Sequence, residues 1–162
     1  KVSKTTLYSR YTSKEALFRA IMQRQMDRVA AAQPLSPREG QLSLAEGLKA
    51  FGRDALESSF EGGLIEVNRL IYSESHRFPE LAVAAAERSH AGVRQVSDFT
   101  APCALADGIP CHQPDVIAEM FILMLRGRYL DVLLAGGTEG MQAHQHWVET
   151  AVDRLLVGRA GW

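Results

Sequence analysis

The stretch that decides the fold is residues 2–18, which read VSKTTLYSRYTSKEALF. It contains two signals for the start of a helix. Ser3 can cap a short first helix. Thr12 followed by Glu15 forms the capping box of a second helix, and Ser13 is an alternative cap. We therefore expect two helices joined by a tight turn.

The first of these helices presents short polar and basic side chains on its outer face. Hydroxyl groups of this size reach base edges or phosphates in the major groove of DNA, and Lys or Arg supplies positive charge. Leu7 and Tyr11 share the opposite face, where they would form part of a small core. Lys14 stands in the first turn of the second helix, a place that favours phosphate contact. The pattern indicates a DNA-reading helix followed by a phosphate-binding turn.

The charge of the chain is distributed unevenly. Residues 1–28 hold seven basic and two acidic residues, whereas the remainder holds 11 basic and 17 acidic residues, within a formal net charge of −1. A basic head on an acidic body fits a segment that faces a polyanion, attached to a body with another task. Clustered charge on a solvated surface would give the same distribution, so charge alone leaves both interpretations open.

Residues 2–17 resemble the tetracycline-repressor (TetR) family of transcriptional regulators, whose pattern is roughly V-S-x-x-T-L-Y-x-x-F-x-S-K-E-x-L. The resemblance implies that Ser3 to Arg10 is the recognition helix of a helix-turn-helix. It also implies that the helix from Ser13 joins this head to the body. The family has two helices before this point, so we expect the sequence to be incomplete at its start. By position, the resemblance implies DNA contacts from Ser3, Lys4, Thr5, Thr6, Tyr8, Ser9, Arg10 and Lys14.

Helix signals recur along the rest of the chain, and strand alternation is absent. We predict an all-α protein in which residues 1–32 are the remnant of the helix-turn-helix domain and residues 33–162 are a helical bundle for effector binding and dimerisation. The expected helices of the body run from Ser43, in a capping box with Glu46, to about Phe60; from Leu64 to about Ser75; from Pro79 to about Phe99, with Pro102 as a breaker; from Pro114 to about Leu134; and from Thr138 to about Val157.

The body also resembles the AefR-like subgroup of the same family, in residues 74–81 and 118–127. Apolar residues at helical spacing share faces with a few polar ones, which is how small-molecule sites are built. The same stripes would equally form a plain core, with Asn68 and His90 as hydrogen-bonded structural residues. The predicted ligand-binding residues are Phe51, Phe60, Val67, Asn68, Ile71, Glu74, Phe78, His90, Arg94, Phe121, Met124 and Leu125.

The helix from Asp115 to Leu134 is apolar on nearly every side, so it needs cover on all sides. In the family, the last two helices pair with their copies in a four-helix bundle, and the resemblance implies the same here. The alternative is that both helices are internal. The predicted dimer interface consists of Phe121, Leu125, Tyr129, Met141, His144, Trp147, Val148, Ala151, Val152 and Leu155.

Several other classes of protein are disfavoured. Apolar residues at 46% and charged residues at 23% exclude a disordered chain or a disulfide scaffold. No apolar run is long enough for a membrane span, and no signal peptide is recognisable. No nucleophile elbow or phosphate-cradling glycine loop occurs, and Cys103, Cys111 and His112 lack the paired spacing of a zinc site. We expect no catalytic residues, no metal and no cofactor.

These patterns together predict a cytoplasmic, homodimeric regulator that binds a double-stranded DNA operator. We expect a repressor that a small apolar or aromatic effector releases from the operator. The alternative is a helical dimerisation or protein-interaction module that has no effector.

Overall fold

A computed structural model describes residues 11–13, 15–21, 24, 42–60, 64–136 and 140–161. Helices dominate these residues and no strand occurs among them, so the predicted all-α class is confirmed. No helix in these ranges is long and apolar enough to cross a membrane. The elements are α3 (Leu44–Phe60), α4 (Leu64–Glu74), α5 (Pro79–Ala106), α6 (Pro114–Leu134), α7 (Met141–Val157) and the short 3-10 helix η1 (Arg159–Gly161).

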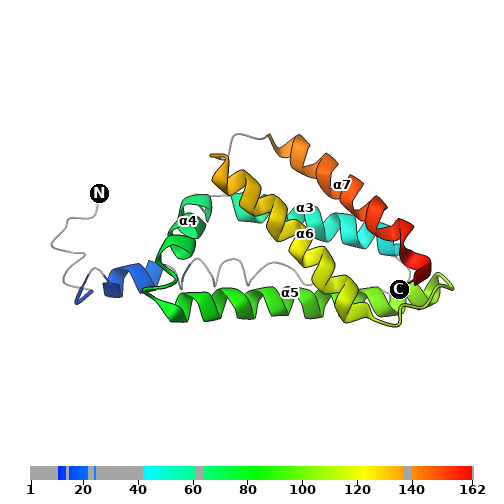
Figure 1. Cartoon of the computed structure of the whole chain (residues 1–162), viewed down its shortest axis with the longest axis horizontal. Helices are drawn as coiled ribbons and strands as arrows, with labels where there is room; N and C mark the ends of the chain where they lie inside the picture. The colour runs from blue at the N-terminus through cyan, green and yellow to red at the C-terminus, as the bar shows by residue number, and fades with distance from the viewer. Residues whose placement is uncertain are drawn as a thin grey trace.

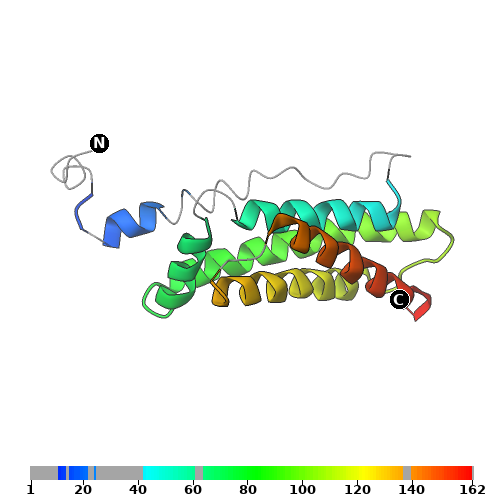
Figure 2. The ribbon, with the colours of Figure 1, turned by 90° about the horizontal axis from the view of Figure 1, so that it is seen from above.

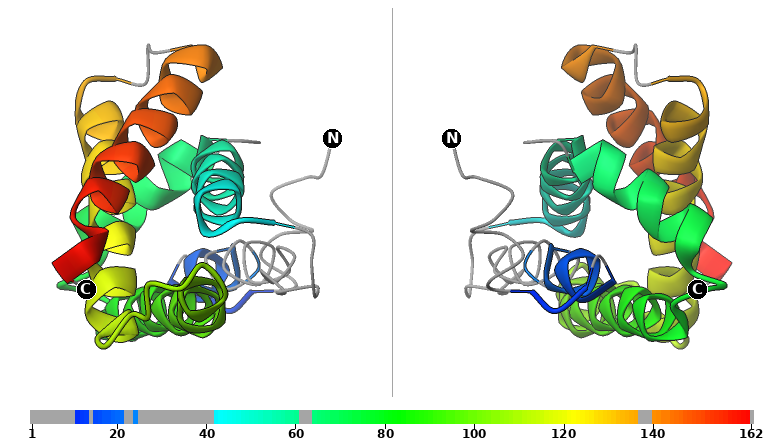
Figure 3. Two further views of the ribbon diagram at one scale, coloured as in Figure 1. Left: turned by 90° about the vertical axis from the view of Figure 1, so that its right-hand side faces the viewer. Right: turned by 90° about the vertical axis from the view of Figure 1, so that its left-hand side faces the viewer.

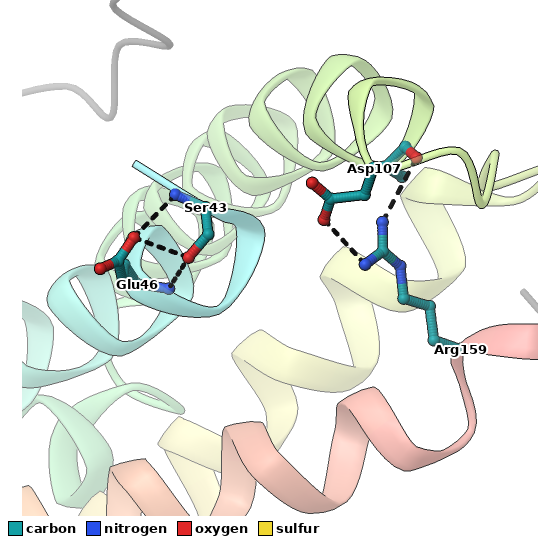
Figure 4. Close-up of polar contacts among 5 residues, drawn as sticks. Ser43, Glu46, Asp107 and Arg159 are labelled. Atoms are coloured by element: carbon teal, nitrogen blue, oxygen red, sulfur yellow. Dashed lines mark hydrogen bonds and ion pairs between the residues drawn. The ribbon is translucent and has the colours of Figure 1, made fainter. Parts of the chain in front are cut away.

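The capping box predicted at the start of α3 is present. The Ser43 backbone N–H donates to the Glu46 carboxylate at 2.9 Å, and the Glu46 N–H donates to the Ser43 hydroxyl oxygen at 3.3 Å (Figure 4). Near the N-terminus, the Ala16 N–H donates to the Ser13 hydroxyl at 3.0 Å. Ser13, the alternative cap, therefore begins the helix that residues 15–21 continue. Local capping chemistry fixes both helix starts.

The prediction that Pro102 ends its helix was wrong, because α5 continues through Pro102 to Ala106. A proline inside a helix removes one N–H donor and crowds the preceding turn. Phe99 and Ala104, on either side of it, are buried among neighbouring helices. This packing outweighs the local penalty. The end of α5 is then tied to η1, where Arg159 donates to the Asp107 carboxylate at 2.8 Å (Figure 4).

The helices enclose α3 on three sides. In Figure 1, α5 runs the length of the molecule, α6 crosses it obliquely, and α7 runs back above α6. The end-on views in Figure 3 show α3 between α5 and α7, and α3 contacts α6 as well. The largest fully buried apolar side chains on these helices are Leu44, Leu48, Val96, Phe99, Phe121, Val148 and Val152.

Two glycines let α3 approach its neighbours closely. A Cβ atom on Gly47 would lie 2.0 Å from the Phe99 ring, and one on Gly52 would lie 2.7 Å from a Val148 methyl group. Both distances are far below van der Waals contact. The absence of side chains at these positions therefore sets the spacing of α3 against α5 and α7.

The short helix α4 lies at the opposite end of α5 from η1 (Figure 1). Its Arg69 guanidinium donates two hydrogen bonds to the Leu133 carbonyl oxygen, at 2.6 and 3.1 Å. That carbonyl is in the last turn of α6, where a cation is favourable for the helix dipole. After this turn, Gly136 adopts a positive φ of 93°. Arg69 thus links α4 to the end of α6.

Candidate functional site

The residues predicted to contact DNA lie outside the described part of the chain. They are Ser3, Lys4, Thr5, Thr6, Tyr8, Ser9, Arg10 and Lys14. The described helix of residues 15–21 follows directly after Lys14 in sequence. Figure 2 shows this helix beside α4 and the beginning of α5. The segment that continues from the predicted head therefore reaches the body at the corner between α4 and α5.

An aromatic contact joins that helix to the body. The Phe18 and Phe78 rings have their centroids 5.0 Å apart, and Phe78 is buried at the turn between α4 and α5. The guanidinium groups of Arg19 and Arg77 lie 5.2 and 5.4 Å from the centroid of the Phe78 ring. Phe78 was predicted to line a ligand site, but its ring is the centre of this joint.

Two ion pairs flank the Phe18–Phe78 contact. Arg19 pairs with Glu80 at 2.5 Å, and Arg77 pairs with Glu15 at 3.3 Å. The pKa of Glu15 is lowered, first by a hydrogen bond from its own backbone N–H and then by Ser13 and the arginines. Both pairs are exposed, so each adds little stability. Both pairs connect the helix of residues 15–21 to the corner between α4 and α5. We call this set of five side chains and Phe78 the Phe78 joint.

The predicted ligand-binding residues divide into several groups. Ile71, Phe121 and Leu125 are buried, and Phe51 packs against Phe121 with ring centroids 6.2 Å apart. Phe60, Asn68, Glu74 and Met124 are half-buried, and the side chain of Val67 lies outside the described residues. His90 and Arg94 are exposed on α5, so the structure does not bring them together with the buried residues. The side of α5 that carries His90 and Arg94 faces solvent.

A polar group that the sequence pattern did not single out lies between α4, α5 and α6. Its centre is Tyr129, predicted for the dimer interface but buried inside the subunit. The Tyr129 ring packs on Phe60 with centroids 5.3 Å apart, and Phe60 stacks in turn on His144 at 4.6 Å. Asn68 lies beside the Tyr129 hydroxyl. Burial is the largest influence and raises the pKa of Tyr129 to about 12, while Asn68 opposes it.

Arg88 on α5 belongs to the same group. Loss of hydration is the largest influence on the Arg88 guanidinium, and it lowers the pKa. Arg126 lowers this pKa further, whereas Tyr72 and Tyr129 raise it. Tyr72 is on α4 and Tyr129 on α6, so three helices contribute to one polar cluster. We call Asn68, Tyr72, Arg88 and Tyr129 the three-helix cluster. Sequence reasoning missed Arg88 because periodicity on α5 alone does not show what faces it.

The residues predicted for the dimer interface are mostly internal. Phe121, Leu125, Tyr129, His144, Val148, Ala151 and Val152 are buried by the subunit's own helices, and α3 in particular covers α7. Trp147 and Leu155 are half-buried, and Met141 is exposed. The side chains that face solvent on α6 form a different stripe at alternating spacings of four and three: Val116, Met120, Leu123, Gly127, Leu130 and Leu134.

This exposed α6 stripe has the spacing of a coiled-coil seam. Leu123 is 52% exposed and Leu134 is 76% exposed, which is unusual for leucines in one continuous row. Gly127 stands in the middle of the row, with no atom within 4 Å of the position of a Cβ. Beside the row, Arg128 lies over the Trp147 ring of α7 at 5.8 Å. The outer surface of α6 therefore continues onto α7.

The surroundings of Cys103 favour its neutral thiol. Burial is the main effect that raises the pKa of Cys103, with a further contribution from Asp107. A reactive cysteine needs a lowered pKa, because the thiolate is the nucleophile. The environment of Cys103 thus stabilises the neutral thiol, and this agrees with a packing role beside the core.

Comparison with known families identifies the body of the chain. The family described as the AefR-like transcriptional repressor, C-terminal domain, matches residues 46–157, which include all of the described helices from α4 to α7 and most of α3. No curated protein matches the chain. The resemblance noted at residues 74–81 and 118–127 falls within the matched range. The chain therefore belongs to the TetR family of transcriptional regulators, with a C-terminal domain of the AefR-like type.

Proposed function

We propose that this regulator is a repressor that dissociates from its DNA operator when a small effector binds between α4, α5 and α6. The observation that carries the proposal is the Phe78 joint. It connects the helix that follows Lys14 to the corner where α4 meets α5. The three-helix cluster includes side chains from both of these helices. One end of α4 and α5 thus contacts the helix from the proposed head, and their inner sides face the proposed effector site.

The proposed response depends on a shift of α4. An effector changes DNA affinity only if it binds one conformation of the protein more tightly than the other. Ligand between α4 and α6 would displace α4, which is short and is linked to α6 through Arg69. The Phe78 ring at the end of α4 would then carry Phe18 and its helix with it. Such a movement would change the spacing of two recognition helices, which must match about one DNA turn, roughly 34–36 Å.

DNA contact is proposed for the residues before this helix. Thr6 and Arg10 would face base edges, whereas Lys14 would bind the phosphate backbone. Substitution of Lys14 should weaken binding to all sequences about equally and reduce the dependence on salt. Substitution of Thr6 or Arg10 should change which sequence is preferred. Equal effects of the two kinds of substitution would contradict these roles.

The homodimer is proposed to form through the exposed α6 stripe. A second copy of α6 would cover the leucines that solvent now contacts, and Gly127 would allow the two backbones to approach at the crossing point. Leu123→Glu would place a charge in this interface and should convert the dimer to a monomer. Sedimentation velocity measures the change. Asp153→Lys serves as the control for a change of surface charge. Asp153 is exposed on α7, where it pairs with Lys49.

The effector response can be separated from binding by substitution at the joint. Phe18→Ala removes the ring that contacts Phe78 and leaves the three-helix cluster intact. We expect operator binding and ligand binding to persist, and the ligand to lose most of its effect on DNA affinity. Ile21→Ala changes an exposed residue of the same helix and is the matched control. Fluorescence anisotropy of labelled operator DNA, with and without ligand, gives the coupling. Unchanged coupling in Phe18→Ala would refute this route.

A dimerisation module without an effector is the second candidate. The exposed α6 stripe favours it, because a second copy of this apolar row would cover it without any ligand. Thermal shifts across a metabolite panel distinguish the two. A stabilised midpoint with any compound supports the effector-responsive regulator, and no shift with any compound supports the module.

A further inference from the structure

The Tyr129 hydroxyl is a buried donor without a well-formed hydrogen bond. Tyr129 is 8% exposed, and its oxygen has no hydrogen-bond partner of good geometry among the described residues, although Asn68 lies nearby. Buried hydroxyls normally have a partner, because an unsatisfied one is destabilising. A tyrosine hydroxyl is protonated at physiological pH even at its ordinary pKa of about 10, so this group can donate a hydrogen bond. The site therefore offers an O–H to an acceptor that the described residues do not supply.

Arg88 on α5 supplies a positive charge within electrostatic range of the Tyr129 hydroxyl. Its side chain is half-buried on α5, and no carboxylate in the described ranges forms an ion pair with it. Arg159, by contrast, pairs with Asp107, and Arg69 donates to the Leu133 carbonyl. The charged side chain that acts on Arg88 is Arg126, which has the same charge. Arg126 donates a hydrogen bond to the Ser89 hydroxyl at 3.3 Å. A partly desolvated cation without an anion is unfavourable unless a ligand supplies one.

We propose that Arg88 and Tyr129 bind the carboxylate of a small organic acid, which is the effector of this regulator. This inference rests on the proposed function, because it names the chemical class that the site between α4, α5 and α6 accepts. The guanidinium would donate two parallel hydrogen bonds to the carboxylate, and the tyrosine hydroxyl would donate a further one. Asn68 would orient the acid from α4.

The surroundings of these two groups define the rest of the ligand. The Phe60 ring packs on Tyr129 and offers an apolar wall. Asn68, Ile71 and Tyr72 share one face of α4, since they are spaced by three and four residues. Ile71 is buried and Tyr72 is exposed, so the face runs from an apolar interior to the surface. An arginine and a neutral donor beside an apolar wall suit the carboxylate of an acid with an apolar body.

Matched pairs of ligands test the proposal. Octanoate and octanamide share a shape, as do naphthoate and naphthamide, but only the first of each pair carries charge. Isothermal titration with the purified protein measures the affinity of each. We expect the better carboxylate to bind about tenfold or more tightly than its amide, the contribution of a charge-assisted pair. The same compound should lower operator affinity in the anisotropy assay.

Variants of Arg88 and Tyr129 test whether these two residues cause the preference for carboxylate over amide. Arg88→Met keeps the apolar stem and removes the charge, and it should remove the preference for carboxylate over amide. Arg88→Lys keeps the charge and should retain part of that preference, which guards against a simple packing loss. Tyr129→Phe should weaken carboxylate binding by a factor of about three to ten. Arg94→Met, an exposed arginine of the same helix, is the control and should bind like the unchanged protein.

The outcomes separate this inference from the proposed function. Equal binding of acids and amides, or an unchanged preference in Arg88→Met, would overturn the carboxylate site, while a neutral compound that releases DNA would leave the effector-responsive repressor standing. Carboxylate binding that disappears in Arg88→Met but never alters operator affinity would support the site and refute the proposed response. Failure of both acids to bind below about 1 mM would overturn the site.

Discussion

The two ends of the helical body differ in how their helices are packed. Around α3, two glycines and a set of fully buried apolar side chains bring α5, α6 and α7 into close contact. Between α4, α5 and α6 lie a buried tyrosine hydroxyl without a well-formed hydrogen bond and a half-buried arginine that pairs with no carboxylate of the described residues. The first arrangement favours rigidity, and in the proposed function the second provides the polar groups that a ligand would bind. The proposed regulator needs both, because ligand binding can move one part of the domain in a defined direction only if another part stays rigid.

The largest expected effect is at the rigid end. Gly47→Ala would place a methyl group 2.0 Å from the Phe99 ring, which is fully buried and cannot move away without disturbing the core. We expect the free energy of unfolding to fall by about 3 kcal/mol. Urea denaturation followed by circular dichroism measures it. Gly127→Ala, in the open part of α6, is the control and should be neutral or stabilising by about 0.5–1 kcal/mol. Similar losses at both positions would remove the contrast between close-packed and open helix surfaces.

The next effect has the opposite sign and belongs to the other end. Tyr129→Phe deletes the unpartnered hydroxyl and keeps the ring on Phe60. We expect the ligand-free protein to gain about 1–2 kcal/mol of stability, since a buried unsatisfied donor is removed. Tyr72→Phe, on an exposed ring of the same cluster, should change little. Thermal unfolding of the three proteins gives the comparison. A loss of stability in Tyr129→Phe would mean that the hydroxyl is satisfied in the folded protein.

A smaller effect is expected where α3 begins. Ser43→Ala removes the hydroxyl that accepts from the Glu46 N–H and donates to its carboxylate. Loss of such a cap should lower the free energy of unfolding by about 1 kcal/mol. Ser73→Ala, whose hydroxyl bonds within exposed α4, serves as the comparison. Equal urea midpoints for Ser43→Ala and the unchanged protein would show that packing alone holds the start of α3.

The smallest effect is a pH dependence of the same cap. Hydrogen bonds from the Ser43 hydroxyl and N–H lower the pKa of Glu46 from its ordinary value of 4.5 in the folded protein. The stabilisation is therefore complete above about pH 4.5 and is lost as the pH falls through the folded pKa. Glu46→Gln should flatten the part of the stability curve that lies below about pH 4.5, where the carboxylate of the unchanged protein becomes protonated. Parallel curves for the two proteins would contradict the assignment.

Local signals predicted the helices well, and they failed where distant segments decide. The capping residues Ser43 and Glu46 and the proline at the start of α6 gave correct helix starts, because each acts within one turn. Pro102 misled for the converse reason, since the packing of α5 overrides a local breaker. In physical terms, a signal that acts over three or four residues is readable from sequence, and one that depends on tertiary burial is not.

The candidate site was less predictable than the fold. Helix α6 is apolar on opposite sides, so its periodicity could not tell the side that meets α3 from the side that meets solvent. The prediction for the dimer interface therefore selected the buried side, including Phe121 and Tyr129. Arg88 was missed because its neighbours come from α4 and α6. Phe78 was predicted to line the ligand site, and only the folded chain shows its contact with Phe18.

The Phe99 ring above Gly47 has a mechanical consequence. The ring occupies the space where a side chain of α3 would otherwise stand, like a peg in a socket. A shift of α3 along α5 would bring this ring against the α3 backbone, so the contact opposes such a movement. If an effector binds near Tyr129, as proposed, the displacement would therefore fall on α4 and on the corner at Phe78.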